Sequence, residues 1–127
     1  MKSLDTNVLL RFLLRDVPDQ TARAIAAVAD DDSYVTDVVV TETVFALEKF
    51  YGAPRDTIAL SIRSFLALPN LTCNEPLFRD VLDLYETRPS LSIVDCYATV
   101  EAGIWNNSLL TFDKNLVKQG GAHVSEP

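Results

Sequence analysis

Short apolar segments alternate with longer helical segments along the chain, and this alternation restricts the fold more than any other feature of the sequence. Apolar residues recur at helical spacing within the longer segments, and Pro, Gly, Asn or Asp stand at most of their boundaries. The expected strands cover residues 2–4, 33–36, 71–73, 109–112 and 122–124, and the expected helices cover 7–14, 19–29, 37–51, 56–68, 76–87 and 92–105. Strands and helices that alternate in this way form a parallel sheet covered by helices. We therefore expect an α/β fold.

The size and composition of the chain fit one globular domain. The 127 residues are 48% hydrophobic and 23% charged, which is ordinary for a soluble protein. No apolar run approaches the roughly 20 residues that span a bilayer. Cys73 and Cys96 are isolated from each other, so they favour a reducing cytosol over a disulfide scaffold or a zinc site. We expect a single domain over residues 1–127, located in the cytoplasm and not in a membrane.

The net charge of −7, from 18 acidic against 11 basic residues, restricts the possible partners. Proteins that coat nucleic acids usually present a basic surface to the phosphates. An acidic protein can still act on phosphates when bound cations bridge the two negative partners.

Two acidic residues follow directly after expected strands. Asp5 comes after Leu4, and Asp113 comes after the segment 109–112. In open parallel sheets, ligands bind beyond the carboxyl ends of the strands. Asp is also a good helix cap, so at this point each residue can be a metal ligand or a cap. Thr111 alternates with Asp113, and the two side chains point the same way if the strand continues that far.

Glu42 lies within the expected helix 37–51. Its neighbours at helical spacing are Val38, Val39, Phe45 and Ala46, which predicts that Glu42 points along a stripe that faces the core. A buried carboxylate needs a partner or a metal ion. The alternative is that Glu42 stands at the edge of this stripe and reaches water.

Asp95 is open to two interpretations that are compatible with each other. The segment S-I-V-D fits a capping box, with Ser92 as the cap and Asp95 three residues later. Asp95 also shares a helix face with the small residues Ala98, Thr99 and Ala102, which lets this face approach a sheet closely. A helix N-terminus favours a carboxylate in either case.

The four acids stand on four separate elements that would converge at one edge of a parallel sheet. Carboxylate ligands without His or Cys favour hard cations, Mg²⁺ or Mn²⁺. Such ions serve phosphoryl chemistry by generating hydroxide and by stabilising charge on the phosphate oxygens. The set consists of Asp5, Glu42, Asp95 and Asp113.

The motifs D-T-N, T-E-T-V-F-A-L, S-I-V-D-C-Y-A and L-L-T-F-D-K-N-L, in this order, resemble the PIN domain family over nearly the whole chain. More narrowly, the stretch D-T-N-V-L-L-R-F-L-L-R-D-V-P-D-Q resembles the single-domain toxins of the VapC type. One departure is Leu116, where many members carry an aromatic residue. By position, the resemblance implies a site of Asp5, Glu42, Asp95 and Asp113, supported by the polar residues Thr6, Asn7 and Thr111.

The resemblance also implies a fold, an activity and partners. The fold would be a Rossmann-like, three-layer α/β/α sandwich with a mostly parallel sheet of about five strands. The activity would be cleavage of RNA with Mg²⁺ or Mn²⁺, leaving 5′-phosphate and 3′-hydroxyl ends. Asp5 and Asp95 would bind the ion directly, Asp113 would assist, and Glu42 would act through water. A VapB-like antitoxin would inhibit the enzyme, and the chain would form a homodimer.

Several residues have both a functional and an ordinary interpretation. Basic residues that could hold RNA phosphates are as easily solvated surface charges, and they are Arg11, Arg15, Lys114 and Lys118. Aromatic residues that could stack on bases are equally good core or dimer residues, and they include Phe12, Tyr51, Tyr97 and Trp105.

Two other classes of protein remain open on the sequence alone. A receiver-like phosphoacceptor domain has a similar length and similar strand-end acids, but it usually has adjacent acids after the first strand. Here Asp5 has no acidic neighbour and Glu42 lies within a helix. The other class is a non-catalytic PIN-like interaction domain that has kept its acidic residues.

Overall fold

The computed structural model describes all residues from 1 to 127. It contains seven helices and five strands of two residues each. The elements, in chain order, are β1 (Lys2–Ser3), α1 (Thr6–Leu14), α2 (Pro18–Asp30), β2 (Ser33–Tyr34), α3 (Asp37–Lys49), α4 (Arg55–Leu66), β3 (Leu71–Thr72), α5 (Glu75–Thr87), α6 (Ile93–Ile104), β4 (Leu109–Leu110), α7 (Lys114–Gln119) and β5 (Val124–Ser125).

The chain divides into two compact units, Met1–Glu75 and Pro76–Pro127. They are the N-terminal unit and the C-terminal unit. The N-terminal unit contains the elements from β1 to β3, and the C-terminal unit contains α5, apart from its first residue, and everything that follows.

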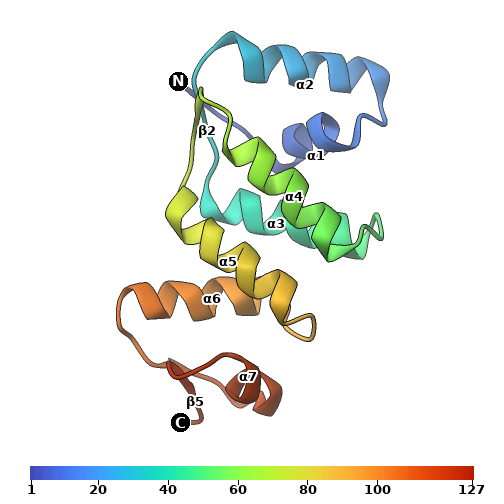
Figure 1. Ribbon diagram of the computed structural model, residues 1–127. Coiled ribbons are helices and arrows are strands. Elements are labelled where there is room, and N and C mark those ends of the chain that lie inside the picture. Colours follow the sequence, from blue (N-terminus) through green and yellow to red (C-terminus); the bar gives the residue numbers. More distant parts are fainter. The chain divides into compact units, whose positions relative to one another are not determined.

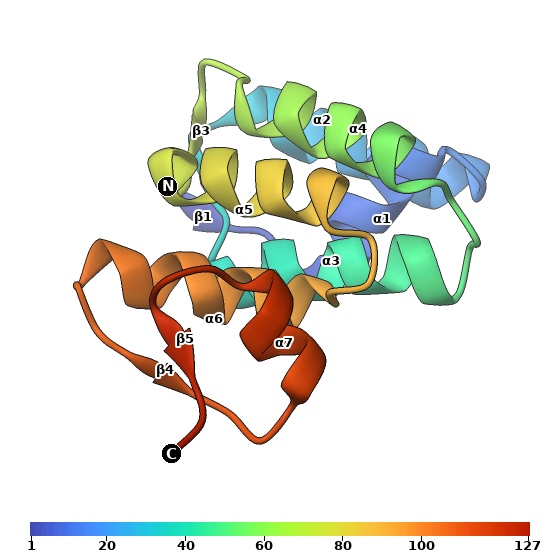
Figure 2. The same cartoon turned by 60° about the horizontal axis from the view of Figure 1, so that its bottom comes forward.

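The N-terminal unit is built on a parallel sheet in the order β1-β2-β3. Lys2 lies opposite Ser33, and Ser33 lies opposite Leu71. Two helices cross over between each pair of strands, α1 and α2 after β1, and α3 and α4 after β2 (Figures 1 and 2). The ladder continues past β1, because the Leu4 N–H donates to the Tyr34 carbonyl oxygen at 2.9 Å. The chain therefore leaves the sheet immediately before Asp5.

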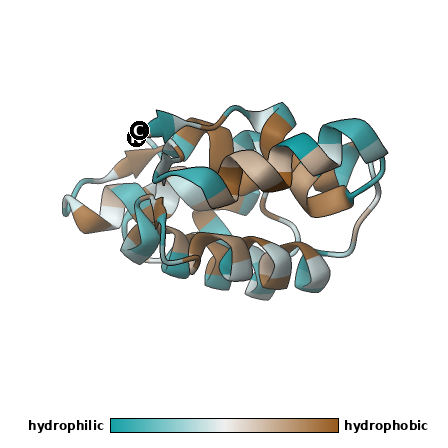
Figure 3. Ribbon diagram, turned by 90° about the horizontal axis from the view of Figure 1, so that it is seen from above, coloured by the Kyte–Doolittle hydropathy of each residue, from teal (hydrophilic) through white to brown (hydrophobic).

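Apolar residues of the helices form the core of the N-terminal unit. Side chains that share one stripe of a helix are buried, while the opposite side is polar, and Figure 3 shows the two kinds of residue on each ribbon. Helix α1 packs beside α2, and the rings of Phe12 and Phe65 meet edge to face at 5.1 Å, which joins α1 to α4. Buried residues of this unit include Leu9, Val35, Val40, Val44, Ile58, Ala59, Ile62 and Phe65.

The C-terminal unit contains a parallel pair of strands, β4 and β5, with Leu109 opposite Val124. Helices α5 and α6 meet through the rings of Phe78 and Tyr97, whose centroids are 5.9 Å apart. Helix α7 lies between β4 and β5 in the chain and buries Leu116 (Figure 2).

The structure confirms the predicted α/β class and the parallel orientation of the strands. The five strands pair as a sheet of three and a sheet of two, whereas the resemblance implied one sheet of about five strands. The strands are shorter than predicted, since the segment expected over 109–112 is regular only at Leu109–Leu110. The last strand begins at Val124, two residues later than predicted. Helix α3 is capped by Thr36, whose hydroxyl oxygen accepts from the Val39 N–H at 3.2 Å. The prediction of one domain over residues 1–127 stays a prediction.

Helix α7 was not predicted. Its six residues, K-N-L-V-K-Q, cover less than two helical turns, which is too short for an apolar period to be visible. None of the seven helices combines the length and the apolar character that crossing a membrane requires.

Candidate functional site

Asp5 occupies the position immediately before α1, where the chain leaves the sheet. Its backbone is extended, with φ −88° and ψ 164°, and its carbonyl oxygen accepts from the Val8 N–H at 3.0 Å. Its exposed side chain makes no capping hydrogen bond. The cap interpretation of the Asp5 carboxylate is therefore wrong, and both carboxylate oxygens remain open to a ligand.

Glu42 is tied to the start of α1 by a hydrogen bond. The buried Thr6 hydroxyl donates to Oε1 of Glu42, which lies 36 residues further along the chain. This contact joins the first residue of α1 to the middle of α3, so it brings Glu42 close to the segment that carries Asp5. The second carboxylate oxygen of Glu42 takes no part in this bond.

The prediction that Glu42 lies on a core-facing stripe is wrong. Glu42 is exposed, and its neighbours Val38 and Phe45 are 74% and 41% exposed. Helix α3 carries apolar residues around most of its circumference, so it offers two possible stripes. The stripe that is buried includes Val40 and Val44 and carries no charged residue. The stripe that contains Glu42 stays exposed, because burying an unpaired carboxylate is costly.

Asp95 lies in the first turn of α6, and the cap of that helix is Ser92. The Asp95 N–H donates to the Ser92 hydroxyl oxygen at 3.1 Å, which confirms Ser92 as the cap. The return bond of a capping box, from the Ser92 N–H to the Asp95 carboxylate, is not made. The half-buried carboxylate thus has no partner in the chain. One turn further on, the Thr99 hydroxyl is buried without a hydrogen-bond partner.

Asp113 caps α7 with one of its two carboxylate oxygens. Oδ1 accepts from the Asn115 N–H at 2.9 Å and from the Leu116 N–H at 3.2 Å. The Thr111 hydroxyl accepts from the Asp113 N–H at 3.0 Å and fixes the approach to the cap. The structural role of Asp113 as a cap is confirmed, and Oδ2 is left over.

One contact in the C-terminal unit was not predicted. The Asn115 side-chain amide donates to the Ser90 hydroxyl at 3.1 Å, which joins the start of α7 to the loop before α6. These are the segments that carry Asp113 and Asp95. Neither Ser90 nor Asn115 belongs to a recognisable motif, and no spacing rule indicates a contact over 25 residues.

The four acids divide equally between the two units. Asp5 and Glu42 belong to the N-terminal unit, and Asp95 and Asp113 belong to the C-terminal unit. Neither unit by itself contains three or more His, Cys, Asp or Glu side chains placed to hold a metal ion. The chemistry of the donors still fits Mg²⁺ or Mn²⁺, because each carboxylate keeps at least one oxygen without a hydrogen bond in the chain.

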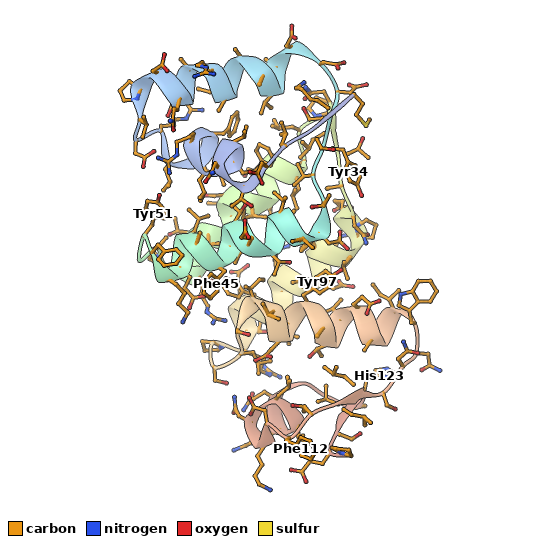
Figure 4. The ribbon with its side chains drawn as sticks, turned by 180° about the vertical axis from the view of Figure 1, so that it is seen from behind. Tyr34, Phe45, Tyr51, Tyr97, Phe112 and His123 are labelled. Atoms are coloured by element: carbon orange, nitrogen blue, oxygen red, sulfur yellow. The ribbon has the colours of Figure 1, made fainter.

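Arg11 lies within α1 and Arg15 lies at its C-terminal end, and the two side chains have different surroundings. Arg11 forms an ion pair with Asp16 at 3.2 Å and donates to the Tyr51 hydroxyl at 2.8 Å, and its side chain is only 17% exposed. Arg15 is exposed, and its guanidinium lies 5.8 Å from the centre of the Phe12 ring. Tyr51, a candidate for base stacking, thus accepts a hydrogen bond from Arg11 through its hydroxyl; the Tyr51 side chain is labelled in Figure 4.

The remaining basic and aromatic residues lie mostly at the surface or in ring contacts. Lys114 forms an exposed ion pair with Glu126 at 3.3 Å, and Lys118 is exposed. Tyr97 packs against Phe78, while Trp105 is exposed at the end of α6.

The parallel strands and crossing helices give an α/β fold, with Asp5, Asp95 and Asp113 at or near helix N-termini and Glu42 within α3. The family model of the PIN domain matches residues 2–121, so the chain belongs to the PIN domain family. Members of this family are typically metal-dependent nucleases and commonly use divalent ions such as Mg²⁺. No curated protein and no solved structure matches the chain significantly.

Proposed function

We propose that this protein is a metal-dependent endoribonuclease of the VapC type, in which Asp5, Glu42, Asp95 and Asp113 form one acidic site. One observation carries the proposal. Asp5 and Asp95 stand at helix N-termini, yet neither carboxylate accepts a hydrogen bond in the chain, and Asp113 and Glu42 each keep one free oxygen. In a family of metal-dependent nucleases, these free carboxylate oxygens would serve as ligands of the metal ion.

The contacts of each carboxylate suggest its role. Asp5 and Asp95 have no partner in the chain, so we assign them to direct binding of Mg²⁺ or Mn²⁺. Asp113 can add Oδ2 while Oδ1 caps α7. Glu42 is oriented by Thr6, and its second oxygen would hold the ion through water. When bound, the ion lowers the pKa of an attacking water and stabilises charge on the phosphate oxygens.

The experiment that tests this function is RNA cleavage with mapped ends. Purified protein is incubated with labelled RNA in Mg²⁺, in Mn²⁺ and in EDTA. We expect internal cleavage that leaves 5′-phosphate and 3′-hydroxyl ends and that stops in EDTA. Cleavage at an undiminished rate in EDTA would rule out the mechanism.

Matched variants distinguish the loss of a site carboxylate from the loss of one negative charge elsewhere on the protein. Asp5→Asn and Asp95→Asn should each abolish cleavage. Asp32→Asn in the N-terminal unit and Asp80→Asn in the C-terminal unit remove the same charge from exposed positions, and they should cleave like the wild type. Equal losses in all four variants would show that the assay responds to net charge and not to a site.

By the same resemblance, we propose that the protein is the toxin of a toxin–antitoxin pair. A VapB-like antitoxin would insert an Arg or Lys among the carboxylates, since the fork of an Arg matches carboxylate geometry. A short neighbouring reading frame that encodes a DNA-binding protein would support this role. A fully inhibited complex in which all four acids stay open to solvent would contradict direct blocking.

Sedimentation equilibrium would test the proposed homodimer.

A further inference from the structure

A groove runs between α1 and α2 in the N-terminal unit, with a volume of about 770 Å³. This volume lies within the range of ordinary ligand sites. One face of each helix lines the groove, at spacings of three and four residues, and the lining residues are Asn7, Val8, Arg11, Gln20, Arg23, Ala24 and Ala27. The groove begins at Asn7, two residues after Asp5.

The charge of the lining is opposite to that of the whole chain. The protein carries −7, whereas the groove is lined by two arginines and no acidic residue. Arg11 is held in place by Asp16 and Tyr51, which occupy two of its five N–H donors and leave the others available. Arg23 is 78% exposed and pairs loosely with Asp19 at 3.7 Å, a contact that a stronger anion can replace.

We propose that this groove binds the phosphate backbone of single-stranded RNA, with Arg11 and Arg23 as the phosphate contacts; this rests on the proposed function. From Gln20 to Ala27, α2 rises about 10 Å, which is the length of about three stacked nucleotides. An amphipathic peptide would need deep apolar pockets for its anchors. Val8, Ala24 and Ala27 offer only small apolar surfaces, so the lining favours a phosphate backbone over a peptide.

The test measures RNA binding without cleavage. All variants carry Asp5→Asn, EDTA is present, and the anisotropy of a fluorescein-labelled single-stranded RNA gives the dissociation constant at several salt concentrations. Arg23→Gln removes one groove charge. Its matched control is Lys49→Gln, which removes one exposed charge, likewise paired with an acid, from α3 of the same unit outside the groove.

We expect Arg23→Gln to weaken binding about eightfold at 50 mM salt and about threefold at 200 mM, because one lost phosphate contact lowers the logarithmic salt slope by about 0.7. Lys49→Gln should leave both quantities unchanged. Ala27→Trp fills the groove without a change of charge, and it should weaken binding while its helical circular dichroism stays that of the parent.

Three results would overturn the proposal. The first is equal weakening by Arg23→Gln and Lys49→Gln, which would reflect net charge alone. The second is a parent protein that does not bind the RNA. The third is a groove that binds a glutamate-rich peptide, with sensitivity to Arg23→Gln, in preference to RNA.

The groove and the proposed function can fail separately. If the wild type does not cleave the same RNA in Mg²⁺ or Mn²⁺ but binding still depends on Arg23, the nuclease assignment fails and the groove stands. If the wild type cleaves while Arg23→Gln alters neither binding nor KM, the groove proposal alone is wrong.

Discussion

Asp5 and Asp113 occupy the same position relative to their helices but differ in what their side chains do. Both are the residue immediately before a helix, and both have an extended backbone. Only Asp113 accepts hydrogen bonds from the first turn, at 2.9 Å and 3.2 Å. Replacing each by Asn and by Ala therefore gives a comparison in which the charge lost is the same and only the cap differs.

The expected magnitudes follow from these contacts. Asn keeps an oxygen that can cap, whereas Ala has none, and a lost cap costs about 1 kcal/mol. Asp113→Ala should thus be about 1 kcal/mol less stable than Asp113→Asn. Asp5→Ala and Asp5→Asn should have nearly equal free energies of unfolding, because there is no side-chain cap to lose. The charge of each carboxylate near a helix N-terminus is lost in both members of a pair, so it cancels.

Urea unfolding followed by far-ultraviolet circular dichroism measures these differences. A change of 1 kcal/mol moves the midpoint by about 0.3–1 M urea. If Asp5→Ala falls below Asp5→Asn by as much as Asp113→Ala falls below Asp113→Asn, Asp5 is a structural cap. Its assignment to the metal would then lose its main support. No gap in the Asp113 pair would show that the cap of α7 adds nothing to stability.

Three further outcomes are expected. Mg²⁺ should raise the melting temperature of the wild type, and by less in Asp5→Asn, because an ion that binds only the folded state stabilises it; an equal rise in both would place the ion elsewhere. Thr99→Val keeps the shape of the side chain and removes a buried hydroxyl without a partner, so urea unfolding should show equal or higher stability; a loss above about 1 kcal/mol would reveal a hidden partner. Burial, and secondarily the charges of Glu75 and Asp37, raise the pKa of Cys73. Its thiolate fraction at pH 8 is thus reduced, and it should react with Ellman's reagent more slowly than a free thiol, with a rate still rising above pH 9.

The sequence predicted the parts of the fold that depend on long periodic segments. The helices of nine residues or more were all expected, because each shows an apolar stripe over at least two turns. Helix α7 was missed because its start depends on the Asp113 cap and its length hides any period. The strands were predicted too long, since residues such as Phe112 have strand composition but are exposed beyond the paired segment.

The sequence named candidate site residues, and most of the contacts that these residues make could not be predicted from it. The apolar neighbours of Glu42 suggested that its side chain is buried, and only the structure shows which stripe of α3 packs into the core. The Thr6–Glu42 bond joins residues that no local pattern relates. The capping motif of Ser92 was readable because capping acts over three residues. The meeting of all four acids depends on the two units together, and it stays a prediction.

The two-residue strands of the N-terminal unit have a consequence for how this unit folds. Each strand finds its neighbour only after two intervening helices have been arranged, since Lys2 faces Ser33 and Ser33 faces Leu71. Closing such long segments costs entropy, and the few ladder bonds gained return little of it. We therefore expect the helices to dock first and the strands to align late. Pulse-labelling hydrogen exchange should find amides of α1 and α3 protected before those of Leu4 and Val35.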